Sequence, residues 1–250
     1  MEVFEHRRHD GALVLGRDKV LSLGRYDGTS QNHRHGRYIP RLLYLDELAH
    51  GSYGLACVAV YSKTSIMKLS HTTTFFDPYA VCRAANVRSG DTVVDLHCGH
   101  HGVCTLPVAE LVGDDGRVYA VDARRSALES LRARAEVAGH GHVETVWGNA
   151  ARTGGVPLDA ELADVVLIVN GLSFLSEHLE VVKEAVRLLK SGGRLAVVDW
   201  KPTGTIRHGP HITRRLSDAR ARSTCLVTGL RYEGDVPVGP HHYAFICQKP

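Results

Sequence analysis

The chain has 250 residues, of which 44% are hydrophobic and 23% charged, and its formal net charge is +3 at pH 7. This length suffices for one well-packed domain with an appendage, and so small a charge does not favour a nucleic-acid-binding protein. No apolar run approaches the roughly 20 residues that cross a bilayer, and the first residues lack the apolar stretch of a secretory signal. We therefore expect a soluble, cytoplasmic protein, with neither nucleic acid nor a membrane among its partners.

Residues 1–70 are interpreted as an N-terminal extension to which the sequence assigns no function. Their clearest pattern is GALVLGRDKVLSLGRY, which predicts two short strands with a turn at Gly16-Arg17-Asp18. Sharper periodicity follows, so we expect residues 71–250 to form the domain proper.

Strand and helix patterns alternate from residue 92 onward. Apolar runs predict five strands, at 92–96, 116–122, 142–147, 163–170 and 193–200. Helical patterns occupy 105–113, 128–139, 177–191 and 217–228, and an antiparallel pair follows at 229–237 and 241–249. This spacing predicts right-handed crossovers and a mainly parallel sheet that helices cover on both faces.

Capping patterns place the ends of two of these helices. Ser126 with Glu129 makes a capping box, and Ser176 is expected to cap the helix that follows it. That second helix is expected to end at Gly192-Gly193. Its predicted apolar stripe consists of Leu179, Val182, Val186 and Leu189.

Open α/β sheets bind their ligands beyond the carboxyl ends of the strands. This rule selects the stretch Asp95 to Cys104 together with Asp122, Asn149, Asn170 and Asp199-Trp200. Asp122 closes the second strand, where a carboxylate can accept hydrogen bonds from two ribose hydroxyls. A dinucleotide would require G-x-G-x-x-G, of which Gly99 and Gly102 alone remain, and Asp95 would repel its pyrophosphate. S-adenosylmethionine instead carries a cationic ammonium and sulfonium, which an acidic group attracts.

Seven segments resemble, in order, those of the class I S-adenosylmethionine-dependent methyltransferases, especially the small-molecule type of ubiquinone and menaquinone biosynthesis. They are HTTTFFDP, VVDLHCG, TLPVAELVGDDGRVYAVD, ETVWGNA, ADVVLIVNGLSFL, LKSGGRLAVVDWKP and HHYAFICQKP. The resemblance implies a Rossmann-like, three-layer αβα fold, with seven mostly parallel strands and an antiparallel last strand. It also implies an enzyme that transfers a methyl group to a small-molecule acceptor, with monomer or homodimer left open.

The resemblance also implies which residues contact the cofactor S-adenosylmethionine. They are Asp95, His97, Gly99 and Gly102 around the methionine, Asp122 and Ala123 at the ribose and adenine, Asn149 and Ala150 near the adenine, and Asn170 to Leu172 along the methyl path.

The turn after the first strand departs from the family pattern, because His97 stands where the first glycine is expected. A side chain that must adopt a positive φ costs on the order of 1 kcal/mol or more, and this one can fill the methionine pocket. Two alternatives therefore stay open. One is a catalytically impaired binding or regulatory protein that keeps the fold, and the other is a metal-binding protein that uses the His and Cys residues of 97–104.

The sequence singles out no catalytic residue. The candidate bases at the carboxyl edge of the sheet are Asp199, His178, His208, His211, His241 and His242. After Trp200 comes a long loop that is interpreted either as a substrate cover or as a solvated basic segment. Its basic residues are Arg207, His208, His211, Arg214 and Arg215.

Overall fold

The computed structural model describes residues 12–14, 20–22, 75–203 and 209–250. Two compact units, Met1–His71 and Thr72–Pro250, are described separately below. In the first unit, β1 (Ala12–Val14) and β2 (Val20–Ser22) pair antiparallel with Leu13 opposite Leu21. The two short strands predicted here are confirmed, and the turn predicted between them lies outside the described residues.

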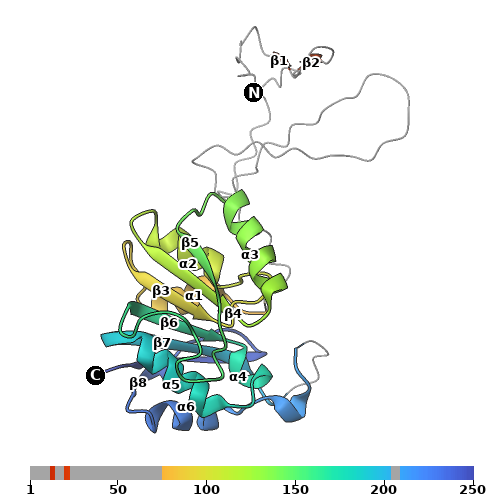
Figure 1. The fold of residues 1–250 in the computed structure, drawn as a ribbon. Coiled ribbons are helices and arrows are strands. Elements are labelled where there is room, and N and C mark those ends of the chain that lie inside the picture. The colour runs from red at the N-terminus through yellow and green to blue at the C-terminus, as the bar shows by residue number, and fades with distance from the viewer. Residues whose placement is uncertain (1–11, 15–19, 23–74, 204–208) are drawn as a thin grey trace, which may run out of the picture. The chain divides into compact units, whose positions relative to one another are not determined.

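The second unit is built on a seven-stranded sheet with the order β5-β4-β3-β6-β7-β9-β8 (Figure 1). Its strands are β3 (Thr92–Leu96), β4 (Arg117–Asp122), β5 (Val143–Trp147), β6 (Ala163–Val169), β7 (Leu189–Trp200), β8 (Arg231–Asp235) and β9 (His242–Gln248). All neighbours from β5 to β7 are parallel, whereas β9 runs antiparallel to both β7 and β8. The predicted sheet, mostly parallel with its last strand antiparallel, is confirmed.

Helices cover both faces of this sheet (Figure 1). Those described are α1 (Pro78–Ala84), α2 (Thr105–Val112), α3 (Arg125–Val137), α4 (Gly171–Phe174), α5 (His178–Leu188) and α6 (Asp218–Leu226), with a 3-10 turn at Ile212–Arg214. Val108 of α2 packs in the same cluster as Val93, and Val182 of α5 packs in the same cluster as Val94. Since successive strand residues point to opposite faces, α2 and α5 lie on opposite sides, as the predicted αβα layers require.

The direction of strand addition reverses at β3, which lies between β4 and β6. From β3 the chain adds β4 and β5 on one side, and then returns to add β6 and β7 on the other. Ligands of open α/β sheets bind in the crevice beyond the carboxyl ends of the strands at such a reversal. This position holds the residues that follow Asp95 at the end of β3.

The two predicted serine caps are wrong. Helix α3 begins at Arg125, with Arg124 at the N-cap position, so Ser126 lies inside the first turn. The helix begins early because Asp122 accepts the Arg124 main-chain N–H at 2.9 Å, which closes the turn directly after β4. Ser176 donates its hydroxyl to Glu177 at 2.6 Å, and Glu177 occupies the N-cap position of α5.

The predicted extent and apolar stripe of α5 are also partly wrong. The helix ends at Leu188, because Leu189 already pairs with Ala163 in the sheet and Gly192-Gly193 lie within β7. Leu179 is 41% exposed, whereas Val182 is fully buried. The buried face of α5 consists of Val181, Val182, Glu184, Ala185 and Leu188.

Candidate functional site

Two buried carboxylates lie at the carboxyl ends of the adjacent parallel strands β3 and β4. Asp95 is 1% exposed and Asp122 is 2% exposed. The turn after β3 connects them, since the Gly99 main-chain N–H donates to Asp122 Oδ2 at 3.1 Å. The negative charge of Asp122 also contributes to raising the pKa of Asp95, so the two groups share one electrostatic environment.

Among the described residues, only one oxygen of Asp95 accepts a hydrogen bond. Thr105 donates its hydroxyl to Asp95 Oδ2 at 2.6 Å, and Oδ1 is buried without a hydrogen-bond partner among the described residues. Burial is the main cause that raises the pKa of Asp95 to about 6. A buried carboxylate with an unmet oxygen destabilises the fold, and it is suited to receive a cationic hydrogen-bond donor.

The turn after β3 uses three residues with positive φ: His97 at 79°, Gly99 at 67° and Gly102 at 57°. At Gly99 a Cβ atom would meet none of the described residues within 4 Å, so there is open space beside this glycine, whose N–H contacts Asp122. A Cβ at Gly102 would instead overlap Leu131 of α3, so this glycine allows the turn to pack on that helix. Glycine is therefore required at Gly102 for packing and at Gly99 for backbone conformation.

His97 adopts the left-handed conformation that normally favours glycine. Its main-chain N–H donates to Val121 O at 2.9 Å, and its ring stacks on Phe174 with centroids 6.0 Å apart. Burial is the main cause that lowers the pKa of His97 below its ordinary value. The imidazole is therefore neutral near pH 7 and does not repel a cationic ligand.

We expect His97→Gly to bind S-adenosylmethionine about fivefold to tenfold more tightly, a gain of roughly 1 kcal/mol. The substitution removes the ring that stacks on Phe174 and so enlarges the space that the methionine portion of the cofactor would occupy. Isothermal titration measures the change, with His101→Ala as the control because His101 is an exposed histidine of the same turn. Unchanged or weaker binding by His97→Gly would show that His97 does not obstruct the site.

Asp122 accepts four hydrogen bonds at the end of β4. Its Oδ1 receives the main-chain N–H of Arg124 at 2.9 Å and the Arg124 Nε at 3.0 Å. Its Oδ2 receives Gly99 N at 3.1 Å and Arg124 Nη2 at 3.1 Å. Burial alone would raise the pKa of Asp122, but the hydrogen bonds from Arg124 outweigh it and lower the pKa below the ordinary value. This carboxylate is thus ionised at neutral pH.

The loop after β5 lies at the same edge of the sheet. The Gly148 N–H donates to Asp122 O at 3.3 Å, which ties this loop to the end of β4. Asn149 is exposed, and its side-chain oxygen accepts the Ala151 N–H at 3.0 Å, while Ala150 is buried. Next to them, Trp147 donates its indole N–H to Ala123 O at 3.0 Å. Asn149, Ala150 and Ala123, predicted to lie near an adenine, thus flank Asp122.

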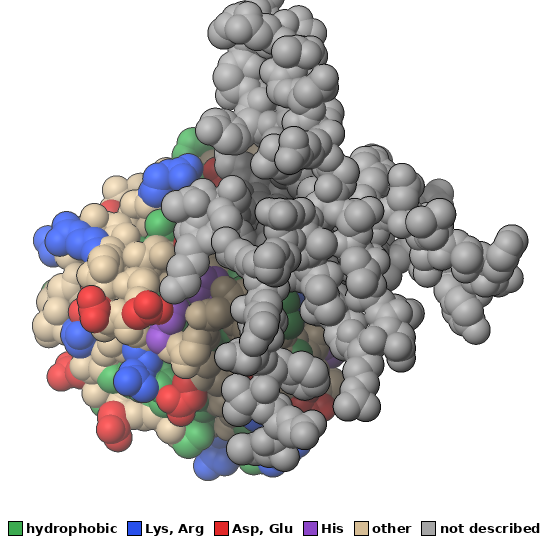
Figure 2. Space-filling model, turned by 90° about the horizontal axis from the view of Figure 1, so that it is seen from above, with side chains coloured by type: hydrophobic (Ala, Val, Ile, Leu, Met, Phe, Trp, Pro, Cys, Tyr) green, Lys and Arg blue, Asp and Glu red, His purple; other side chains and the backbone are tan. Residues whose placement is uncertain are grey.

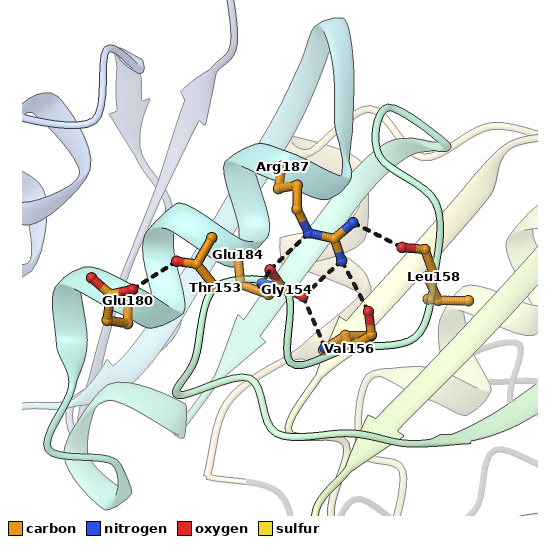
Figure 3. A network of polar contacts seen from close by, with 7 residues as sticks. All are labelled: Thr153, Gly154, Val156, Leu158, Glu180, Glu184 and Arg187. Carbon is orange, nitrogen blue, oxygen red and sulfur yellow. Dashed lines mark hydrogen bonds and ion pairs between the residues drawn. The ribbon is translucent and has the colours of Figure 1, made fainter.

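Glu184 anchors the continuation of this loop to α5, as Figure 3 shows. The fully buried Glu184 accepts the main-chain N–H groups of Gly154 at 2.6 Å and Val156 at 3.0 Å. Its carboxylate also pairs with Arg187, with Nη2 at 2.7 Å and Nε at 2.9 Å. Glu184 was not predicted from the sequence, although it lies three residues after Val181 and four before Leu188, on the buried face of α5.

Asn170 lies at the end of β6, the strand on the other side of β3. It adopts a φ of 57°, and its Oδ1 lies 3.1 Å from His242 Nε2. Burial is the main cause that lowers the pKa of His242 to about 4, so the ring is neutral at pH 7 and donates from Nε2. Leu172, also predicted along the methyl path, is fully buried in α4.

Asp199 holds main-chain groups in place. Its Oδ2 accepts the Ser173 N–H at 2.9 Å and its Oδ1 accepts the Trp200 N–H at 2.7 Å. Burial raises the pKa of this fully buried carboxylate. Of the candidate bases it is therefore interpreted as a structural group that fixes the start of α4 beside Asn170.

The candidate bases and the basic loop are not gathered at one point. His211 is exposed and lies 2.9 Å from the Thr213 hydroxyl, and His208 and Arg207 lie outside the described residues. Arg214 donates to Phe174 O at 2.9 Å, and Arg215 donates to Pro210 O at 3.0 Å. Both arginines donate to carbonyls of the protein, but only Arg215 is buried, whereas Arg214 is exposed. The solvated-loop interpretation is therefore wrong for Arg215 alone.

His178 and His241, the two remaining candidate bases, are both half-buried. The ring of His241 lies 6.2 Å from that of Phe75, at the same edge as His242. On the face that Figure 2 shows, acidic and basic side chains of the described residues are interspersed, with histidines among them. Neither the histidines nor the surface charge identifies a catalytic base.

The turn at 97–104 does not assemble a metal centre. Cys98 packs with Leu128 and Leu131, and Cys104 is buried in a different cluster with Val108. Within the part of the chain that the structure describes, no three His, Cys, Asp or Glu side chains are placed to hold a metal ion. The metal-binding alternative therefore receives no support.

The sheet order, with two buried carboxylates where the order reverses, defines a Rossmann-like protein. The chain belongs to the ubiE/COQ5 methyltransferase family, whose model matches residues 62–206. This confirms the family resemblance, and six of the seven sequence segments lie within the matched residues, whereas HHYAFICQKP lies beyond them.

The curated relatives include two demethylmenaquinone methyltransferases. The protein from Lactococcus lactis is 33% identical over 111 residues, which are 44% of this chain and 42% of the relative. That from Anoxybacillus flavithermus is 32% identical over 114 residues, or 46% of each chain. The chain thus matches somewhat less than half of the length of these relatives.

Solved structures share the fold. A SAM-dependent methyltransferase from Aquifex aeolicus superposes with a TM-score of 0.66 at 24% identity, covering 72% of this chain and 94% of the other. Geranyl diphosphate methyltransferase in complex with SAM gives a TM-score of 0.55 at 15% identity, covering 69% of this chain and 84% of the other.

Among the described residues, no helix has the length and apolar character needed to span a membrane.

Proposed function

We propose that residues 71–250 form an S-adenosylmethionine-dependent methyltransferase domain that acts on a small molecule in the cytoplasm. The observation that carries the proposal is the unmet, buried Oδ1 of Asp95, next to a turn with open space at Gly99. A cationic nucleoside supplies what this site lacks, because its ammonium can donate to Asp95 and its ribose can reach a second carboxylate at Asp122. The residues present therefore fit the cofactor that the family uses.

The proposed cofactor contacts follow the edge of the sheet. Asp95, His97, Gly99 and Gly102 would surround the methionine portion. Asp122 would hold the ribose, Ala123, Asn149 and Ala150 the adenine, and Asn170 with Leu172 the path of the methyl group. S-adenosylmethionine, when bound, supplies a methyl group that its positive sulfur already activates. The protein then needs mainly to align the acceptor and exclude water.

The proposed acceptor is a quinone-like molecule, as the names of the curated relatives suggest. Aromatic rings at the carboxyl edge support a flat substrate, since Phe75 lies 5.2 Å from Trp200 and Trp200 lies 4.1 Å from His242 between ring centroids. Neutral His242 holds the oxygen of Asn170, which leaves the Asn170 amide N–H groups to face other partners. No residue is assigned as the base.

Isothermal titration with S-adenosylmethionine and S-adenosylhomocysteine tests the proposal. We expect dissociation constants tighter than roughly 100 μM, near −5.5 kcal/mol. Asp122→Ala is expected to abolish the binding while the protein stays folded.

The second candidate function is that of a binding or regulatory protein with this fold, and the histidine at position 97 favours it. Absence of both heat and a thermal shift would support it and contradict the enzyme.

A further inference from the structure

Arg124 takes the hydrogen-bonding positions on Asp122 that a ribose would need. Its guanidinium gives Nε to Oδ1 at 3.0 Å and Nη2 to Oδ2 at 3.1 Å. The main-chain N–H groups of Arg124 and Gly99 take one further position on each oxygen. A carboxylate has about four lone-pair positions, so the carboxylate of Asp122 is saturated by the protein itself.

We infer that Arg124 is an internal competitor of the cofactor's ribose for Asp122 and thereby sets the affinity of the cofactor site. The inference rests on the proposed function. It assigns Arg124 a role that neither the glycine pattern of the turn nor the strand-end carboxylates predict.

The geometry allows the guanidinium to leave while the carboxylate stays. The Arg124 side chain is 52% exposed, whereas that of Asp122 is 1% exposed. The two main-chain donors are fixed by the turn and by the start of α3, so they hold Asp122 in either state. Release of the guanidinium into water frees one position on each oxygen, which matches the two neighbouring hydroxyls of a ribose.

When a ribose replaces the Arg124 guanidinium on Asp122, the number of hydrogen bonds stays the same, but a positive charge is lost from the carboxylate. Two neutral hydroxyls replace a cation that forms a bidentate, charge-assisted pair with a carboxylate. Binding therefore has to draw on the fraction of molecules whose Arg124 is released, and the apparent affinity falls by that fraction. A pair with one exposed partner is of modest strength, so the expected penalty is about threefold to thirtyfold in affinity.

Arg125 provides a matched control on the same helix turn. Its guanidinium lies 4.4 Å from the centroid of the Trp147 ring and makes no ion pair with Asp122. Substitution at Arg125 removes the same positive charge from the start of α3 without freeing the carboxylate. The comparison separates competition for Asp122 from a general effect of charge.

The experiment titrates S-adenosylhomocysteine into the full chain and into the Arg124→Ala and Arg125→Ala variants. We expect Arg124→Ala to bind about threefold to thirtyfold more tightly and Arg125→Ala to stay within about twofold. Adenosine and 2′,3′-dideoxyadenosine are compared in the same way. The gain from Arg124→Ala should appear with adenosine and vanish with the dideoxy compound, which lacks the two hydroxyls.

Each other outcome is decisive. Unchanged or weaker binding of S-adenosylhomocysteine by Arg124→Ala, where the unaltered protein binds it, overturns this inference and leaves the proposed function standing. An equal gain with adenosine and its dideoxy analogue also overturns it, because the guanidinium would then act through charge alone. If none of the folded proteins binds S-adenosylhomocysteine, both the inference and the proposed function fail.

Discussion

Glu184→Ala is expected to lower the free energy of unfolding by about 3–5 kcal/mol, since it breaks a buried ion pair by removing one partner. Arg187, with its side chain 24% exposed, would lose the carboxylate that it contacts at 2.7 Å. The main-chain N–H groups of Gly154 and Val156 would lose their acceptor as well. Chemical denaturation, followed by circular dichroism, measures the loss.

Glu180→Ala is the control on the same helix. Glu180 also joins the loop to α5, through the Thr153 hydroxyl at 2.7 Å (Figure 3). It also pairs with Lys183. Both of these partners are exposed, so we expect its removal to leave the unfolding free energy unchanged within error. An equal loss in the two variants would contradict the special role of the buried pair.

The effect of Glu184 also has a defined dependence on pH. Burial alone would raise the pKa of Glu184, but the hydrogen bonds from Arg187 and the two main-chain N–H groups lower it below the ordinary 4.5. A carboxyl whose folded pKa is depressed stabilises the protein above the unfolded pKa, and this stabilisation is lost as the pH falls through the folded pKa. The stability difference between the protein and Glu184→Gln should therefore shrink only in acid.

The sequence predicts the sheet because the strands are continuous apolar runs. In β3, Val93 and Val94 are both fully buried on opposite faces, and such a strand is recognisable without knowledge of its neighbours. The placement of Asp95 and Asp122 at strand ends follows from the same pattern. Sequence order and strand alternation thus specify both the layers and the edge at which the carboxylates lie.

Features that depend on contacts distant in the sequence were not predictable in the same way. Leu179 fits a helical stripe in the sequence, but it is exposed because the buried face of α5 is set by its rotation against the sheet. Glu184 resembles a solvated charge until the loop at 153–158 is placed beside it. Arg124 likewise resembles a surface residue in the sequence. Its two guanidinium hydrogen bonds to Asp122 depend on the conformation of the turn after β4.

Asp95→Asn is expected to gain stability with rising pH relative to the unaltered protein and to lose most of its affinity for S-adenosylmethionine. Burial raises the pKa of this carboxyl from 3.8 to about 6 in the folded state. For an acid whose folded pKa is raised, the folded form is favoured at low pH and loses stability as the pH rises between the two values. The unfolding free energy of the variant relative to the protein should therefore improve by about 2–3 kcal/mol between about pH 4 and about pH 8.

The two effects of Asp95→Asn have one cause. An ionised carboxylate with its Oδ1 unmet costs stability in the free protein, and the ammonium of the cofactor would remove this cost by binding to it. Thermal unfolding at several pH values measures the first effect and isothermal titration the second, with Asp115→Asn as a control that removes an exposed carboxylate. If Asp95→Asn instead lost stability at high pH relative to the unaltered protein, the ionised carboxylate of Asp95 would stabilise the fold. That outcome would contradict a cost of leaving Oδ1 unmet. A carboxylate that destabilises the free protein and is needed for binding is what a preorganised cation site requires.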